Sequence, residues 1–166
     1  MGAEATLVII KPDAILRGLA GRVVSRLEEL RLEIIAAKAV RVNRQLAEEH
    51  YKDLRGKPFF EELLDHIQGK LHHTNYVLAF VFWGEEAIAH VRQVAGATHP
   101  EKADPLSLRG SLGRMTTAGV MENILHTSSN AAEAEREVKL WFSPQELLHN
   151  PYSGRWSAMA GVSDKR

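Results

Sequence analysis

The chain has 166 residues, enough for one domain with a substantial core, and its 45% apolar and 25% charged residues are ordinary for a soluble domain. It carries 21 basic and 21 acidic side chains, and this zero net charge gives no overall attraction to nucleic acid or to an anionic membrane. Any phosphate must therefore be bound by a local cluster of cations. The lack of cysteine excludes disulfides, zinc–thiolate sites and thiol catalysis, and the longest apolar runs have the length of strands.

Apolar patterning predicts five elements in the first half of the chain. Thr6–Ile10 is short, apolar and β-branched, which predicts a buried strand, and the proline in Lys11-Pro12-Asp13 ends it. Apolar residues at helical spacing predict an amphipathic helix over residues 20–31. The next elements are a strand over Glu33–Val42, a helix that Asn43 caps and that carries Leu46, His50 and Leu54 on one side, and a helix over Pro58–Ile67.

The second half begins with a polar connection over Gly69–Asn75, followed by the clearest strand, Tyr76–Trp83, and a short helix over Glu85–Val94. Residues 95–119 contain four glycines, two prolines and little periodicity, which predicts one long loop with a turn of helix near Leu106. Long ordered loops inside compact domains are usually functional. The remaining elements are a strand over Val120–Leu125, a helix over Ala131–Phe142 that Asn130 caps, and an irregular tail over residues 148–166.

The order of elements is β-α-β-α-α-β-α-loop-β-α, without an internal repeat, a linker or a domain boundary. It predicts a single α/β domain over residues 1–166, with helices packed on one face of a four-stranded sheet. The pattern alone does not fix the order of the strands in the sheet.

His126 follows the apolar run Val120–Leu125 at a point where a strand gives way to a helix. The strand holds such a side chain rigidly, and the free N–H groups of the following helix favour negative charge beside it. A carboxylate on that helix, such as Glu137, could bind one ring nitrogen and leave the other nucleophilic. The competing interpretations are a structural or surface histidine and a solvated Glu137, which are the usual roles of such residues.

Three cations that are distant in sequence are candidates for a phosphate clamp. Lys11 ends the first strand, Arg92 lies near the end of a helix, and Arg109 lies in the long loop. If they converge, the arginines supply bidentate donors and the lysine a point charge. Because the chain has neither a GxxxxGK[ST] motif nor a GxGxxG motif after a strand, phosphate recognition must rest on side chains.

Tyr51 and Phe59 flank the two middle helices, where an aromatic residue is by default part of the core. Phe59 and Phe60 are adjacent, however, and adjacent helical positions face different ways. One of the two rings should point outward, where a nucleobase could stack on it. His72 and His73 lie in a polar connection without a partner at metal-binding spacing, which predicts a solvated loop.

These features coincide with a resemblance to the nucleoside diphosphate kinases, which extends to about residue 147. Several matches in the family's order are far more specific than any one of them. The matching stretches are Val8-Ile-Ile-Lys-Pro-Asp13, Arg17-Gly-Leu19, His50-Tyr-Lys-Asp-Leu54, Lys57-Pro-Phe-Phe60, Gly96-Ala-Thr-His-Pro100, Leu108-Arg-Gly110, Asn123-Ile-Leu-His126 and Glu137-Val-Lys-Leu-Trp-Phe142.

The resemblance implies a ferredoxin-like fold with a four-stranded antiparallel sheet, assembled into dimers and then tetramers or hexamers. It implies ping-pong transfer of the γ-phosphate of a nucleoside triphosphate, typically ATP, to a nucleoside diphosphate, with Mg²⁺ bridging the nucleotide phosphates and no protein ligand of its own. His126 matches the nucleophile, phosphorylated on its δ nitrogen, while Glu137 matches the carboxylate that orients it and Ser128 the serine beside it. The nucleotide-binding positions match Lys11, Tyr51, Arg92, Thr98, Arg109 and Asn123 for phosphates and ribose, Phe59 for stacking on the base, and Leu63 and Val120 as its apolar neighbours. Stacking permits every base, which implies broad base specificity.

The chain departs from the family pattern beside the nucleophile. The pair before it is Glu122-Asn123 in place of Arg-Asn, the nucleophile segment is His126-Thr-Ser-Ser129 in place of His-Gly-Ser-Asp, and Arg109-Gly-Ser111 replaces Arg-Gly-Asp. Two insertions stand out against the family, one near Lys70–Asn75 and one over Gly113–Gly119. These departures bear on assembly and nucleotide affinity more than on the chemistry.

An active nucleoside diphosphate kinase is the favoured interpretation, and two others stay open. A non-catalytic nucleotide-binding or regulatory member of the family would be consistent with the charge reversal at Glu122. A single-stranded RNA-binding module would use a similar sheet, but zero net charge and the lack of an aromatic RNA-binding strand count against it. The expected partners are nucleoside di- and triphosphates and further copies of the chain, without nucleic acid or membrane. The N-terminal sequence lacks a secretory pattern, so the expected location is the cytoplasm.

Overall fold

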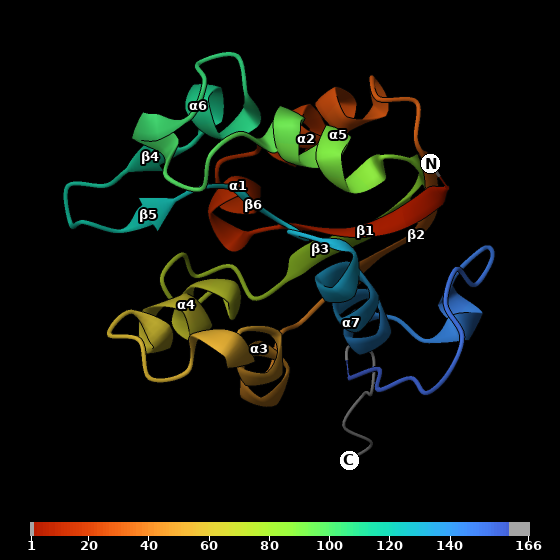
Figure 1. Ribbon diagram of the computed structural model, residues 1–166. Helices are drawn as coiled ribbons and strands as arrows, with labels where there is room; N and C mark the ends of the chain where they lie inside the picture. The colour runs from red at the N-terminus through yellow and green to blue at the C-terminus, as the bar shows by residue number, and fades with distance from the viewer. Residues whose placement is uncertain (1, 160–166) are drawn as a thin grey trace.

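The computed structural model describes residues 2–159 and contains one four-stranded sheet (Figure 1). All its neighbouring strands are antiparallel, and the spatial order is β2-β3-β1-β6. This arrangement confirms the ferredoxin-like sheet that the resemblance implied. The strands are β1 (Ala3–Ile10), β2 (Glu33–Val40), β3 (Val77–Glu85) and β6 (Leu125–Thr127), and a separate two-stranded ribbon consists of β4 (Arg114–Met115) and β5 (Met121–Glu122).

Helices cover both faces of the sheet, so the expectation that they lie on one face is wrong. The helices are α1 (Pro12–Leu16), α2 (Ala20–Glu28), α3 (Arg44–His50), α4 (Phe60–Ile67), α5 (Ala87–Ala95), α6 (Leu108–Leu112) and α7 (Ala131–Trp141), with 3₁₀ turns η1 (Lys52–Leu54), η2 (Pro100–Lys102) and η3 (Pro144–Glu146). In the view of Figure 1, α2, α5 and α6 lie above the sheet and α3, α4 and α7 below it.

The central strand β1 explains why two layers form. Leu7 and Ile9 belong to the core below the sheet, whereas Val8 and Ile10 belong to the core above it, and all four are fully buried. A strand with four consecutive apolar residues must be covered on both faces there, because successive side chains alternate. The continuous apolar run that predicted the strand was therefore also evidence that helices pack on both faces of the sheet.

Local capping signals predicted where α3 and α7 begin. The side chain of Asn43 accepts a hydrogen bond from the Leu46 N–H at 2.8 Å, and that of Asn130 accepts one from the Glu133 N–H at 3.0 Å, so both expected caps are confirmed. The helix expected over residues 20–31 ends at Glu28, and Arg31 then adopts a positive φ of 57°. Pro12 does more than end β1, since it occupies the first turn of α1.

The region expected to be a long loop over residues 95–119 contains η2, α6 and β4. The strand expected over Val120–Leu125 is interrupted at Ile124, whose φ of 61° is rare for a β-branched residue. The residues before this point pair with β4 in the ribbon, and those after it enter the sheet as β6. His126 consequently lies within the sheet, opposite Ile9, rather than beyond the end of a strand.

The C-terminal tail is largely irregular as far as residue 159 and packs back on the domain. The Leu148 N–H donates to the Ile35 carbonyl at 2.9 Å, and the Met159 N–H donates to the Leu140 carbonyl at 2.8 Å. The rest of the expected tail, residues 160–166, lies outside the described residues. Within the described part of the chain, no helix combines the length and apolarity that crossing a membrane requires.

Candidate active site

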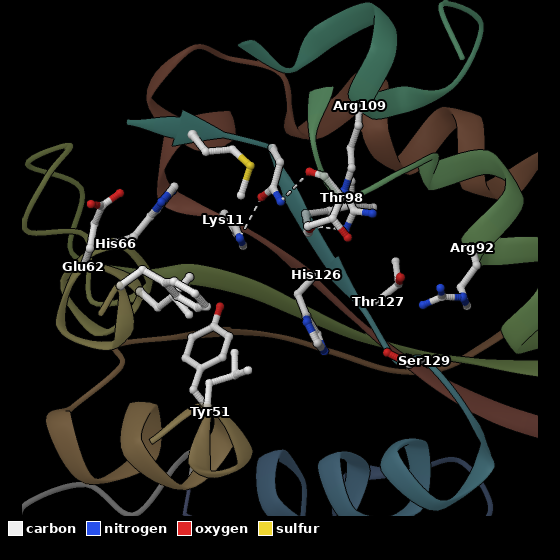
Figure 2. Close-up of a pocket in the computed structure, with 16 residues that line it drawn as sticks. Lys11, Tyr51, Glu62, His66, Arg92, Thr98, Arg109, His126, Thr127 and Ser129 are labelled. Atoms are coloured by element: carbon white, nitrogen blue, oxygen red, sulfur yellow. Dashed lines mark hydrogen bonds between the residues drawn. The ribbon is translucent and has the colours of Figure 1, made fainter. Parts of the chain in front are cut away.

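A cavity of about 430 Å³ opens between the α3–α4 side of the molecule and the side that carries α5 and α6 (Figure 2). Its volume is in the range of small-ligand sites. Figure 2 shows His126 in its centre, with Tyr51 on one side and Arg92 and Thr127 on the other. The expected site residues that line it are Lys11, Tyr51, Phe59, Leu63, Arg92, Thr98, Arg109, Asn123 and His126.

One end of the cavity is apolar and is formed mainly by α4 and η1. The Phe59 side chain is 48% exposed at the cavity, whereas Phe60 packs against the core below the sheet. The expectation that one of these two rings points outward is therefore confirmed. Leu63 and Leu54 complete this end, which offers a planar ring and aliphatic surface to a ligand.

The opposite end is cationic, and Arg109 is its most tightly held member. Its guanidinium is buried and donates to the Gly96 carbonyl at 2.7 Å and to the Leu125 carbonyl at 2.9 Å. Burial, and then the nearby charge of Arg92, lower the pKa of Arg109 to about 10. Gly96 has a φ of 82°, and a Cβ there would lie 2.2 Å from the Ser107 Oγ, so this turn requires glycine.

Lys11 joins the cationic end through Asn123. Its Nζ donates to the Asn123 Oδ1 at 2.7 Å, and the Asn123 Nδ2 donates to the Thr98 carbonyl at 3.0 Å (Figure 2). Burial lowers the pKa of Lys11 to about 8, despite the opposing influence of Asp13. A lysine with this pKa is charged at neutral pH and is close to releasing its proton in mildly alkaline solution.

If ADP binds at this end of the cavity, as the resemblance implies, we expect its affinity to fall as the pH rises above 8, because Lys11 loses the charge that attracts phosphate. Bound phosphate favours the protonated amine, so ADP binding above pH 8 should take up a proton. Titration calorimetry in two buffers of different ionisation enthalpy measures this uptake. The variant Lys11→Met should bind ADP more weakly and show no such uptake, and an uptake that persists in that variant would assign it to another group.

The His126 ring is held from one side by Glu137 of α7. The Nε2 atom lies 2.9 Å from the Glu137 Oε1, while the Ser128 Oγ donates to the Glu137 Oε2 at 2.6 Å and accepts from the Leu7 N–H at 3.1 Å. Burial alone would raise the pKa of the Glu137 carboxyl, but the charge and hydrogen bond of His126 outweigh it and lower that pKa to about 2. An ionised carboxylate accepts hydrogen bonds only, so it fixes the proton of neutral His126 on Nε2 and leaves the Nδ1 lone pair free.

Two aromatic residues that sequence reasoning did not assign to the site lie behind His126. The ring of His50 is perpendicular to that of His126, with centroids 4.5 Å apart, and the Trp141 Nε1–H donates to the His50 Nδ1 at 3.2 Å. Burial lowers the pKa of His50 well below its usual value, so its ring is neutral. Trp141 lies one helical turn after Glu137, and this i, i+4 spacing was the available sequence signal.

Among the described residues, the one group of side chains close enough to share a metal ion consists of His50, His126 and Glu137. The chemistry of His50 does not suit this role. Because Trp141 donates to Nδ1, Nε2 must carry the proton, and a protonated nitrogen has no lone pair for a metal. These residues are therefore better described as support for His126 than as metal ligands.

Several predictions about the surroundings need correction. Val120 is not among the residues that line the cavity, and Met121 lines it instead; Val120 lies at the turn of the β4–β5 ribbon, where its backbone N–H donates to the Thr116 Oγ1. His72 is not solvated but buried, with its Nε2 3.0 Å from the Glu122 Oε1. Further lining residues that were not predicted are Leu54, Glu62, His66, Met121, Leu125, Thr127 and Ser129. Glu62 and His66 could have been found, because they follow Phe59 at helical spacing.

The comparison with known proteins agrees with this geometry. The family model described as nucleoside diphosphate kinase matches residues 4–147. The nucleoside diphosphate kinase of Pyrococcus horikoshii is 41% identical over 159 residues, which cover 96% of this chain and 98% of that protein. That of Symbiobacterium thermophilum is 40% identical over 153 residues, which cover 92% of this chain and 96% of that protein.

Solved structures give the same result. A nucleoside diphosphate kinase from Borrelia burgdorferi, a transition-state mimic with bound vanadate and ADP, is 34% identical with a TM-score of 0.79, over 90% of this chain and 93% of that one. The enzyme from Halobacterium salinarum in complex with CDP is 37% identical with a TM-score of 0.79, over 88% of this chain and 91% of that one. With the family model covering most of its length and relatives near 40% identity, this chain belongs to the nucleoside diphosphate kinase family and is a phosphotransferase that acts on nucleotides.

Proposed function

We propose that the chain transfers the γ-phosphate of a nucleoside triphosphate, typically ATP, to nucleoside diphosphates by a ping-pong mechanism through a phosphohistidine on His126. The observation that carries this proposal is the pairing of the His126 Nε2 with Glu137 inside a cavity that has one cationic and one apolar end. This pairing leaves Nδ1 as the nucleophilic atom of the ring.

In the first half-reaction, the Nδ1 lone pair of His126 attacks the γ-phosphorus, the bond from this phosphorus to the β,γ-bridging oxygen breaks, and the nucleoside diphosphate leaves. In the second half-reaction, an oxygen of the acceptor's terminal phosphate attacks the phosphorus, and the P–N bond breaks. The imidazolium character of the phosphorylated ring is offset by Glu137, which remains ionised because its pKa is about 2. Ser128 holds this carboxylate in place through its hydroxyl.

The cationic end of the cavity suits the phosphate chain. Lys11, Arg92 and Arg109 offset the charge that develops on the transferred phosphoryl group, since preorganised cations stabilise such a transition state. Thr98 and Asn123, which are linked to Lys11, suit contacts to phosphate and ribose. Tyr51 contributes a neutral phenol, because burial raises the pKa of its hydroxyl.

The apolar end suits the base. Phe59 offers its ring for stacking, and Leu63 and Met121 offer aliphatic surface. Every nucleobase has a π-face, so an end that relies on stacking accepts purines and pyrimidines alike. We therefore propose broad base specificity.

Mg²⁺ is the proposed cofactor, held by the phosphates of the nucleotide rather than by protein ligands. The donor set supports this arrangement, because the phosphate end presents cations, amides and hydroxyls. Magnesium favours oxygen ligands and commonly bridges substrate phosphates. When bound there, it supplies charge neutralisation and orientation of the phosphate chain.

We further propose that residues 1–166 form one nucleoside diphosphate kinase domain that assembles as a homo-oligomer, either a tetramer or a hexamer built from dimers. The strand β2 lies at an edge of the sheet, so its outer backbone groups suit pairing with a second copy. Nucleoside di- and triphosphates are the proposed partners, without nucleic acid or membrane. Because its substrates are nucleotides, we propose that the enzyme works in the cytoplasm.

The alternative of a non-catalytic nucleotide-binding or regulatory member rested on Glu122. That carboxylate is bound by Arg114 and His72 and is not among the cavity residues, so it places no negative charge on a bound nucleotide. The further alternative of an RNA-binding module is opposed by the helices that cover both faces of the sheet, since base-stacking sheets need one open face.

The proposal predicts a phosphorylated intermediate. Mixing the protein with ATP and Mg²⁺ should add a single phosphoryl group per chain in the intact mass spectrum, and a GDP chase should remove it with formation of GTP. If folded protein that binds ATP acquires no adduct, the catalytic proposal fails and the regulatory alternative replaces it. An adduct that GDP cannot discharge would contradict the ping-pong step.

A further inference from the structure

Two buried side chains and an exposed arginine that binds one of them lie next to the cavity, outside the residues assigned to the reaction. We call this group the brace, and it consists of His72, Arg114 and Glu122. The Glu122 side chain is 4% exposed, and its Oε1 lies 3.0 Å from the His72 Nε2, while its Oε2 accepts from the Arg114 Nε at 2.6 Å. Although burial would raise it, the hydrogen bonds from Arg114 and His72 leave the pKa of Glu122 below its usual value.

The brace joins two segments that are far apart in the sequence. His72 lies in the connection between α4 and β3, and Arg114 lies in β4 of the ribbon. The two residues are 42 positions apart in the chain, and both bind the same carboxylate. The ring of His72 also packs against that of His66, with centroids 4.8 Å apart, and the His66 Nε2 lies 2.8 Å from the Asp13 Oδ1.

Glu122 stands between two residues that line the cavity, Met121 and Asn123. In extended backbone, successive side chains alternate, so an anchor at position 122 fixes the direction of its two neighbours. Asn123 in turn receives the hydrogen bond from Lys11 and donates to the Thr98 carbonyl. The position of this amide therefore depends on a charged contact on the opposite side of the same backbone.

We propose that His72 and Glu122 are positioning residues for nucleotide binding, which hold Met121 and Asn123 in the geometry that receives base and ribose. The inference rests on the proposed function, since it assigns the cavity to a nucleotide. The brace touches neither the nucleophile nor the cations that face the transferred phosphoryl group. Breaking it should therefore weaken nucleotide binding much more than it slows phosphoryl transfer from bound nucleotide, which the brace reaches only through the hydrogen bond between Asn123 and Lys11.

The test compares His72→Gln, Glu122→Gln and the combined variant with two controls, His73→Gln in the same connection and Glu101→Gln on η2, both of which are exposed residues. Titration calorimetry with ADP and Mg²⁺ gives the dissociation constant, and single-turnover phosphorylation at saturating ATP gives the rate of transfer. Each single variant should raise the dissociation constant about tenfold, the effect expected for losing a buried charged hydrogen bond. The combined variant should bind ADP no more weakly than Glu122→Gln alone, because His72 acts through its contact with Glu122.

The inference is overturned if both single variants bind ADP as wild type does, if the whole loss appears in the transfer rate, or if His73→Gln has the same effect as His72→Gln. Should Glu122→Gln fail to fold, Arg114→Gln replaces it, because the Arg114 side chain is 54% exposed and its loss leaves no buried cation. This variant should also raise the dissociation constant, and unchanged binding would overturn the inference. A wild type that binds ADP but forms no phosphoenzyme would contradict the proposed function alone, since the binding comparison still tests the brace.

Discussion

His126→Ala should abolish phosphoenzyme formation and lower turnover by a factor on the order of 10⁴ or more, as removal of a covalent nucleophile does in other enzymes. The imidazole is the group from which Nδ1 can attack phosphorus, and no neighbouring side chain can substitute for it. The neighbouring histidine, His50, cannot replace it, because its Nδ1 accepts the Trp141 N–H and its Nε2 must carry the proton. Intact mass after mixing with ATP, together with a coupled assay of GTP formation, measures both effects.

The matched control is His149→Ala, which removes a partly exposed histidine on the C-terminal side of the molecule. It should form the phosphoenzyme as wild type does. ADP binding should survive in His126→Ala, because the cations and the stacking ring are intact, so a loss of activity without loss of binding assigns His126 to the chemical step. Phosphorylation that persists in His126→Ala would identify a different nucleophile and contradict the proposed mechanism.

The parts of the fold that could be predicted from sequence are those set by neighbours along the chain. Thr6–Ile10 is apolar enough to be a strand in any context, and Asn43 and Asn130 begin helices through hydrogen bonds to residues only three positions away. The outward direction of Phe59 followed from helical geometry in the same way. Such signals need no knowledge of tertiary structure.

Ile124 shows where local reasoning ends. The apolar run that contains it has the pattern of one continuous strand, yet its backbone adopts a positive φ. Its N–H is held by the Asp13 Oδ2 at 3.0 Å, and its carbonyl accepts the Lys11 N–H at 2.9 Å, contacts across more than a hundred residues. No local residue propensity predicts this interruption. It is the reason that the expected strand over Val120–Leu125 is divided, and that Val120 does not lie at the cavity.

In the candidate site, too, sequence predicted the features that depend on neighbouring residues better than those that depend on long-range contacts. Convergence of Lys11, Arg92 and Arg109 was a conditional prediction, and it depended on the sheet order that sequence pattern left open. His72 was expected in solvent because its neighbours are polar, but a carboxylate fifty positions later buries it. The family resemblance supplied the long-range information for residues in the matching stretches, and it could supply none for the contacts of His72, Arg114 and Glu122, which lie outside them.

Glu137→Gln should lower the rate of phosphoenzyme formation on the order of 10³-fold or more, because the amide favours the wrong tautomer of His126. The Ser128 hydroxyl accepts from the Leu7 N–H and directs its own hydrogen toward residue 137. The amide oxygen of the new glutamine should turn to this donor, which leaves its NH₂ group facing His126. The ring nitrogen Nε2 must then accept, and the proton moves to Nδ1, the atom that has to attack. A comparable exchange of carboxylate for amide behind the histidine of serine proteases costs about 10⁴ in kcat.

The measurement pairs single-turnover phosphorylation with ¹⁵N NMR of the histidine ring nitrogens, which reports the tautomer directly. Glu135→Gln on the same helix is the control, because that carboxylate is 46% exposed and binds Lys139 rather than His126. The substitution should also change the pH dependence of stability: since the pKa of Glu137 is lowered from 4.5 to about 2, its stabilising effect in wild type is complete above pH 4.5 and is lost as the pH falls toward 2. The glutamine variant should therefore be less stable than wild type at neutral pH, and this difference should shrink on acidification.

If Glu137→Gln forms the phosphoenzyme slowly while NMR shows that His126 still carries its proton on Nε2, the tautomer explanation is wrong. Glu137 would then act by stabilising the charge of the phosphorylated ring.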